Sequence, residues 1–262
     1  MLPKEHGAWN VLLVSLIAGW IALGHWNVAA LAVSLLWFSG FVLRTPLTTY
    51  RQYRKADPAK ARQAVGVSAF WLMVLILSGI VFYQTAPEKD VRIVFLVAGP
   101  LGTVIFIMAA VRRSLRFFEA ELLGFVGICL VAPVIYLSSP LNDMTKALWL
   151  YMLIGGYFIL ALLYIKVRQS WVAQARQGLR LTLSQRCSQS CFVFLLHIFY
   201  IGAVMATAPS WLWGIGPLYA GIKAGIGLGW GKPNLPIMKL GIREMIHSLV
   251  YMVFAVCTWK LF

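Results

Sequence analysis

The chain has 262 residues, of which 61% are hydrophobic and 12% are charged. A soluble globular domain is about 45–50% apolar and about 25% charged, so this composition excludes one. Lys and Arg total 23 against 8 Asp and Glu, which gives a net charge of +15. In a soluble protein this charge would suggest nucleic acid binding. Here short basic segments alternate with long apolar runs, so we assign the charge to membrane topology and expect no nucleic acid partner.

Nine apolar segments are long enough to cross a bilayer, which takes about 20 residues. The eighth, WLWGIGPLYAGIKAGIGLGW, holds many glycines and Lys223, so we leave open whether it is continuous, broken or re-entrant. Because no polar linker divides the chain, we expect a single all-α integral membrane domain, residues 1–262, built as a bundle of nine transmembrane helices. The predicted spans are 7–24, 27–43, 64–84, 92–111, 119–138, 147–165, 188–207, 210–229 and 242–261.

The loop charges predict the orientation of this bundle. With nine spans, eighteen Lys and Arg residues fall on the side of the N-terminus and four on the other side. Cytoplasmic loops carry the excess of Lys and Arg, so the N-terminus is expected in the cytoplasm and the C-terminus outside. The predicted cytoplasmic loops are 44–63, 112–118, 166–187 and 230–241.

Two of these loops, RTPLTTYRQYRKADPAKARQ and KVRQSWVAQARQGLRLTLSQR, place Tyr, Trp and Leu among arginines at helical spacing. This pattern predicts short amphipathic helices at the cytoplasmic surface. The basic side chains either extend to anionic headgroups without specificity, or they grip one anionic ligand through bidentate hydrogen bonds. The candidate residues for such a site are Arg44, Arg51, Arg54, Arg62, Arg112 and Arg113.

Ionisable residues within a span are costly and indicate a functional site when no partner explains them. In the last span, Arg243, Glu244 and His247 lie at the inner end, and the i, i+3 spacing puts the carboxylate and the imidazole on one face. Three interpretations are open: a proton relay, half of a metal site, or a buried hydrogen-bonded pair of Glu244 and His247 that fixes the helix. The structural pair is favoured. Lys223 either faces a carboxylate such as Glu244 across a cavity or extends to the inner surface.

Four further polar residues are candidates on the same grounds. Glu119 and Glu121 open the fifth span after a basic segment, where acids favour the helix dipole. His6 precedes the first span, where an interfacial role is favoured over a ligand role. His197 lies deep in the seventh span, where a neutral imidazole needs a hydrogen-bond partner. No spacing assembles a metal site, and we assign no metal and no catalytic residue.

Four segments of the chain resemble the YwiC-like family of bacterial membrane proteins. They are PKEHGAW at residues 3–9, RTP at 44–46, EAELLGF at 119–125 and GIREMIHS at 241–248. The resemblance implies a bacterial membrane protein, and with the predicted orientation it places the chain in the cytoplasmic membrane as a multi-pass protein. It implies no activity.

The nine spans, with cytoplasmic loops after the second, fourth and sixth, also resemble the UbiA superfamily of intramembrane prenyltransferases. There, Asp-rich motifs after the second and sixth helices bind magnesium and a prenyl diphosphate. Here the first loop has only Asp57 among cations, and residues 166–189 contain no Asp or Glu. Magnesium is held to diphosphates through carboxylates. We therefore expect a UbiA-like topology without the standard metal-dependent prenyl transfer, and leave open whether the chain is an enzyme.

Three functions remain open at this point. The first is a protein that binds an isoprenoid, a quinone or an anionic phospholipid through a basic cytoplasmic-side cavity; these lipids are the only bound cofactors we expect. The second is an accessory or assembly subunit of a larger, respiratory-type membrane complex, which would have partner membrane subunits. The third is a small-anion transporter that uses the same arginines with Lys223 or His197.

Overall fold

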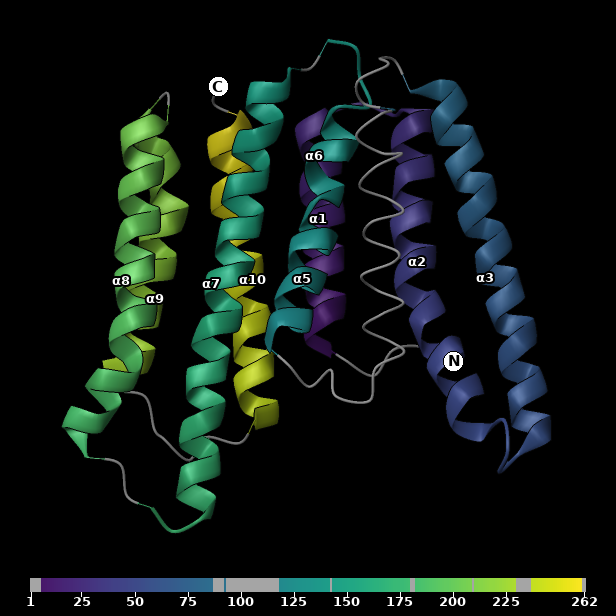
Figure 1. Cartoon of the computed structure of the whole chain (residues 1–262). Helices are drawn as coiled ribbons and strands as arrows, with labels where there is room; N and C mark the ends of the chain where they lie inside the picture. The colour runs from purple at the N-terminus through teal and green to yellow at the C-terminus, as the bar shows by residue number, and fades with distance from the viewer. Residues whose placement is uncertain are drawn as a thin grey trace. The chain divides into compact units, whose positions relative to one another are not determined.

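The computed structural model describes residues 6–86, 92, 118–141, 143–179, 182–208, 210–229 and 237–260 (Figure 1). Every regular element in these ranges is a helix. The chain divides into two compact units, Met1–Tyr151 and Met152–Phe262, which are described separately below. The helices are α1 His6–Leu23, α2 Val28–Tyr53, α3 Pro58–Thr85, α5 Phe118–Cys129, α6 Val131–Tyr136, α7 Met144–Arg176, α8 Leu183–Thr207, the 3₁₀ helix η1 Trp211–Gly214, α9 Ile215–Gly229 and α10 Ile237–Lys260.

Five of these helices are long and apolar enough to cross a membrane. The expectation of an all-α, multi-span membrane protein is therefore confirmed for the described part of the chain. The predicted span 92–111 lies outside the described residues except for Arg92, so the number nine stays a prediction. The five long segments are Val28–Tyr53, Pro58–Thr85, Met144–Arg176, Ser184–Thr207 and Met238–Lys260, and the shorter apolar ones are Gly7–Leu23 and Glu121–Tyr136.

The helices run into the segments expected to be cytoplasmic loops. Residues 44–53 continue α2, and α3 already begins at Pro58, so the connection between them is only four residues long. Likewise α7 continues to Arg176. The short amphipathic helices expected in these loops are thus corrected to extensions of the spans, because a basic amphipathic segment can prolong a helix beyond the apolar layer without a break.

In the first unit, α1 and α6 approach closely at a small residue. A Cβ atom built on Gly19 would lie 3.0 Å from the backbone Cα and O of Ala132 and from Cβ of Ile135. Small residues at such contacts let helix backbones come together in a membrane. Around this contact, Val33, Phe82 and Ile135 belong to one buried apolar cluster. The contact fixes α1 against α6 without any polar group.

The fifth predicted span, 119–138, is interrupted rather than continuous. It forms α5 and α6, with the break at Leu130. Pro133 has no N–H group to donate to the carbonyl of Cys129 and its ring crowds that carbonyl, so the regular ladder stops one turn before the proline.

Asn27 joins two elements of the first unit. Its side chain accepts hydrogen bonds from the backbone N–H groups of Ala29 and Ala30, at 2.8 and 3.3 Å, and so caps the N-terminus of α2. Its amide nitrogen also donates to the carbonyl of Ser138 at 3.0 Å. One side chain therefore fixes the start of α2 and the segment after α6.

We expect Asn27→Ala to lower the free energy of unfolding by about 2 kcal/mol, roughly half from the lost cap and half from the lost hydrogen bond to Ser138. Asn27→Asp keeps the capping oxygen but cannot donate to Ser138, so it should cost about half as much. Unfolding by SDS titration from mixed micelles measures both. Equal losses for the two variants would show that the cap contributes nothing.

The second unit contains α7 from Met152 onward, together with α8, η1, α9 and α10. Gly178, at φ 77°, ends α7. The N–H of Leu179 bonds to the carbonyl of Gln174, and that of Gly178 to Ala175, which is a Schellman arrangement. After it, Thr182 and Gln185 form a capping box that starts α8. The turn from α7 to α8 is thus defined at both ends by local hydrogen bonds.

The eighth predicted span, 210–229, consists of the short 3₁₀ helix η1 followed by the continuous helix α9. It is therefore one helical segment with a tighter first turn. Its glycines allow close packing: a Cβ atom on Gly227 would lie 2.2 Å from the hydroxyl oxygen of Tyr164 on α7. Hence α9 can lie directly against a tyrosine of α7.

Candidate functional site

The first candidate site is the basic end of the α2 and α3 pair. Three arginines are exposed here: Arg51 and Arg54 at the end of α2, and Arg62 in the first turns of α3. Arg44, which lies earlier on α2, is half-buried. Lys60 lies over the ring of Tyr53, 4.2 Å from its centroid. The connection between the two helices therefore carries a cluster of cations, as the sequence predicted. Arg112 and Arg113 lie outside the described residues.

Asp57, the single acid of this connection, has a structural role at the start of α3. Its carboxylate accepts a hydrogen bond from the backbone N–H of Lys60 at 3.0 Å and is the N-cap of α3. Magnesium is held to a diphosphate by one or more carboxylates with near-octahedral oxygen geometry. One capping carboxylate among arginines does not fit that metal, so no metal-assisted step is assigned to this site.

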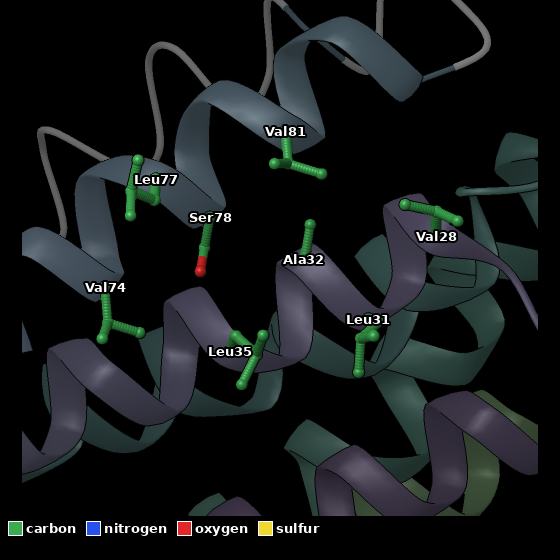
Figure 2. Close-up of a pocket in the computed structure, with 8 residues that line it drawn as sticks. All are labelled: Val28, Leu31, Ala32, Leu35, Val74, Leu77, Ser78 and Val81. Carbon is green, nitrogen blue, oxygen red and sulfur yellow. The ribbon is translucent and has the colours of Figure 1, made fainter.

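An apolar groove of about 290 Å³ lies between the same two helices, away from the basic end. Figure 2 shows the side chains of α2 and α3 that line it, with Ser78 as the single hydroxyl. Its edge nearest the basic end is formed by Leu35 and Val74. The lining residues are Val28, Leu31, Ala32, Leu35, Val74, Leu77, Ser78 and Val81.

The second candidate site is a buried ion pair in the second unit. The ammonium of Lys223 on α9 donates to Oε2 of Glu244 on α10. The two residues are only 7% and 6% exposed. This is the partner that the sequence suggested for Lys223. The other carboxylate oxygen of Glu244, Oε1, is buried and has no hydrogen-bond partner among the described residues.

On one side of this pair, α7 supplies an aromatic ring and a guanidinium. The ammonium of Lys223 lies 4.6 Å from the ring centroid of Tyr164. Arg168, 2% exposed, donates to the carbonyl of Gly227 at 3.0 Å. That carbonyl is among the last four of α9, which have no partner inside their helix and form its negative end. Arg168 therefore caps α9 from a neighbouring helix.

The indole of Trp171, which is fully buried, packs against Arg168. The Arg168 guanidinium lies 5.0 Å from the indole centroid and that of Arg186 lies 6.0 Å from it. The indole N–H donates to Oε1 of Gln189 on α8 at 2.8 Å. One aromatic ring thus contacts cations from two helices and bonds to a third group.

On the other side of the ion pair, His247 bonds to α9 rather than to Glu244. Its Nδ1 lies 2.5 Å from the hydroxyl oxygen of Tyr219. Its Nε2 lies 3.4 Å from Nε of Arg243, which is exposed. The structural pair expected between Glu244 and His247 is therefore not the arrangement found, because each residue takes a partner on α9.

Three tyrosines continue the polar groups along α7, α8 and α10. Tyr251 and Tyr200 have their hydroxyl oxygens 3.0 Å apart, and both donate to the carbonyl of Leu153, at 2.8 and 3.1 Å. Tyr157 stacks on Tyr251 with ring centroids 4.0 Å apart. Its hydroxyl is buried and has no partner among the described residues. These groups could not be inferred from the sequence, because a tyrosine in an apolar run is typical of packing or of the membrane interface.

The remaining sequence candidates fall elsewhere. His197 is 3% exposed. Its Nδ1 donates a hydrogen bond to the carbonyl oxygen of Val193, one turn earlier on α8, at 2.8 Å. Glu121 is half-buried on α5 and has interaction partners. The side chains of His6 and Glu119 lie outside the described part, although both positions are helical. No three potential metal ligands gather within the described ranges.

Several apolar helices of membrane-spanning length define the class of this protein. It is an all-α multi-pass membrane protein. A family model described as YwiC-like protein matches residues 2–136, and the chain belongs to this YwiC-like family. No curated protein and no solved structure matches the chain. Lys223 and Glu244 lie outside the matched residues.

Proposed function

We propose that this protein binds the anionic headgroup of a membrane lipid at the basic end of α2 and α3. The observation that carries the proposal is the gathering of exposed Arg51, Arg54 and Arg62 at that connection. With 26 residues, α2 is about 39 Å long at 1.5 Å per residue. The hydrocarbon layer is about 30 Å thick, so this end lies at the headgroups.

The arginines suit a phosphate or diphosphate better than a neutral headgroup. A guanidinium presents a planar set of donors that bonds two oxygens of one phosphate at once. Because the Asp57 carboxylate is used to cap α3, the local charge stays strongly positive. We assign this end to the cytoplasmic face of the bacterial inner membrane, following the distribution of Lys and Arg among the loops.

The apolar groove on the same two helices suggests the nature of the tail. Its near edge at Leu35 lies sixteen residues before Arg51, which is about 24 Å along a helix axis. A ligand that occupies both features needs an apolar chain that reaches about 24 Å from its anionic head. This favours an isoprenoid diphosphate over an ordinary phospholipid, and a quinone, which has no anionic head, fits the basic end least well.

We expect the double variant Arg54→Gln, Arg62→Gln to bind the lipid about 30-fold more weakly, since each Lys or Arg near an anionic surface contributes about 1 kcal/mol. The matched control is Lys146→Gln, Lys260→Gln, which removes two exposed cations at helix ends assigned to the outer face. Native mass spectrometry of protein released in polymer nanodiscs, with organic extraction, gives the bound lipid. Titration with a prenyl diphosphate or with phosphatidylglycerol gives the affinities.

Each outcome of this experiment has a clear meaning. Tighter retention of the prenyl diphosphate supports an isoprenoid ligand, and equal retention of phosphatidylglycerol supports a phospholipid. Equal binding by the arginine variant and its control would contradict the proposed site. Stoichiometric partner proteins without any retained lipid would instead favour the alternative of an accessory subunit in a larger membrane complex. The alternative of anion transport at Lys223 is weakened because Glu244 balances that charge.

A further inference from the structure

Nine ionisable side chains of the second unit lie on α7, α8, α9 and α10 around the buried ion pair. We name as the polar column the residues Arg168, Tyr164, Lys223, Glu244, Tyr219, His247, Tyr157, Tyr251 and Tyr200. On α7 alone, the column extends from Arg168 to the carbonyl of Leu153. These positions are fifteen residues apart, or about 22 Å along the helix at 1.5 Å per residue. The column therefore covers most of a hydrocarbon layer about 30 Å thick.

The centre of the column is an ion pair that packing alone does not require. Removing a carboxylate and an ammonium from water costs several kcal/mol for each ion, and apolar residues of similar volume are often as stable in the same place. Within a membrane such groups mark ion pathways and proton relays. Lys223 is the single charged residue among the buried residues of α9, and Glu244 is the single charged one among those of the described part of α10, so a function beyond packing is indicated.

The two carboxylate oxygens of Glu244 differ in their hydrogen bonding. Oε2 accepts from Lys223, whereas Oε1 is buried without a partner among the described residues. A carboxylate accepts hydrogen bonds only, but its protonated form also donates one. Oε1 is therefore the place in this site where an added proton would form a new O–H bond.

Each helix that packs around Glu244 contributes a titratable or charged group. On α7 these are Tyr157, Tyr164 and Arg168, and on α9 they are Lys223 and Tyr219. Its own helix carries Arg243 and His247, and α8 supplies buried His197. Tyr219 bonds to His247, whose Nε2 faces exposed Arg243, and the ring of Tyr157 stacks on Tyr251, whose hydroxyl oxygen lies 3.0 Å from that of Tyr200. A ring stack carries no proton, so protons move between Oε1 and these hydroxyl and imidazole groups through bridging water.

We propose that the polar column is a proton-transfer path through the Met152–Phe262 unit, with Glu244 as the group that takes up and releases the proton. The YwiC-like match ends at residue 136 and covers none of these residues, and none of them belongs to the lipid site at α2 and α3. The ligand of this second site is the proton itself.

The step balances without any other reactant. A proton binds Oε1 of Glu244, the O–H bond forms, and the ion pair becomes a hydrogen bond from the Lys223 ammonium to a neutral acid. The site then carries one more positive charge. When the O–H bond breaks, the electron pair stays on Oε1, the proton leaves along the other half of the column, and the ion pair forms again. A pH difference across the membrane drives the exchange.

The test is proton flux into liposomes that contain the full chain and an internal pH-sensitive dye, with a potassium gradient and valinomycin to set the potential. We expect flux above that of protein-free liposomes, and we expect Glu244→Gln to reduce it by about 100-fold, within the range that a positioned acid–base group contributes. The matched control, Asp143→Asn, makes the same chemical change at an exposed carboxylate that accepts from the N–H of Lys146. It should conduct as the unchanged protein does.

A second variant separates loss of transfer from loss of folding. Lys223→Met combined with Glu244→Gln removes both charges of the pair, so it should stay folded while lacking flux. Infrared difference spectra on acidification should show the band of a buried protonated carboxyl group in the unchanged protein and in Asp143→Asn, but not in Glu244→Gln. Flux at the protein-free rate in the unchanged protein, or full flux in the folded double variant, would overturn the proposal.

Discussion

Lys223→Met should lower the free energy of unfolding by about 3–5 kcal/mol, the usual cost of removing one partner of a buried ion pair. Methionine matches the lysine side chain in length, so the packing against Tyr164 is largely kept. What is lost is the ammonium that compensates the carboxylate of Glu244, which is only 6% exposed. The carboxylate then remains buried without a counter-ion, and this accounts for the size of the effect.

The double variant Lys223→Met, Glu244→Gln is the control for this prediction. With both charges removed, the destabilisation should fall well below that of Lys223→Met alone, and the difference is the coupling energy of the pair. SDS titration of the two variants, of Glu244→Gln and of the unchanged protein completes the cycle. Additive effects of the two single substitutions would show that the ion pair contributes nothing to stability.

Trp171→Ala should also cost about 3–5 kcal/mol, as truncation of a large buried aromatic residue does. The indole is fully buried, and it contacts the guanidinium groups of Arg168 and Arg186 as well as bonding to Gln189. Its removal opens a cavity between α7 and α8 and leaves the Gln189 oxygen without its donor. The end of the polar column at Arg168 loses its support in the same step.

Trp171→Phe distinguishes the cavity from the hydrogen bond. Phenylalanine keeps an aromatic face for the two arginines but cannot donate to Gln189, so we expect a loss of only about 1–2 kcal/mol. Thermal unfolding in detergent, followed by tryptophan fluorescence and circular dichroism, ranks the two variants. If both variants lose the same amount, the hydrogen bond rather than the filled volume holds this region.

The five long apolar helices of the structure coincide with predicted spans, but the ends of these helices were predicted poorly. Apolar runs define the part of a helix that lies in the hydrocarbon layer, and nothing in α2 stops the helix where that layer ends. The predicted span ended at residue 43, but α2 continues through Pro46 to Tyr53. The actual stop comes at Asp57 and Pro58, where the carboxylate and the ring start a new helix. The signals Gly178 and Thr182, which end α7 and begin α8, were readable but were assigned to a loop.

For the candidate sites, the charged residues were predictable and the tyrosines were not. Lys223 and Glu244 attract notice because charge within a span is rare, and opposite charges suggest a pair. The partner of His247 could not be inferred, since the i, i+3 spacing to Glu244 is satisfied on the same helix whether or not the two bond. Tyr157, Tyr200 and Tyr251 depend on how α7, α8 and α10 pack, which helical periodicity alone does not specify.

The close contact between Gly19 and Ala132 has a consequence for how the protein responds to cold. Burial of apolar surface from water weakens as temperature falls, and this is why many soluble proteins lose stability on cooling. Helices that already lie in lipid meet through dispersion contacts, without that contribution. The association of α1 with α6 should therefore persist undiminished near freezing, and preparations of this protein in lipid should tolerate low temperatures that loosen water-soluble helical bundles.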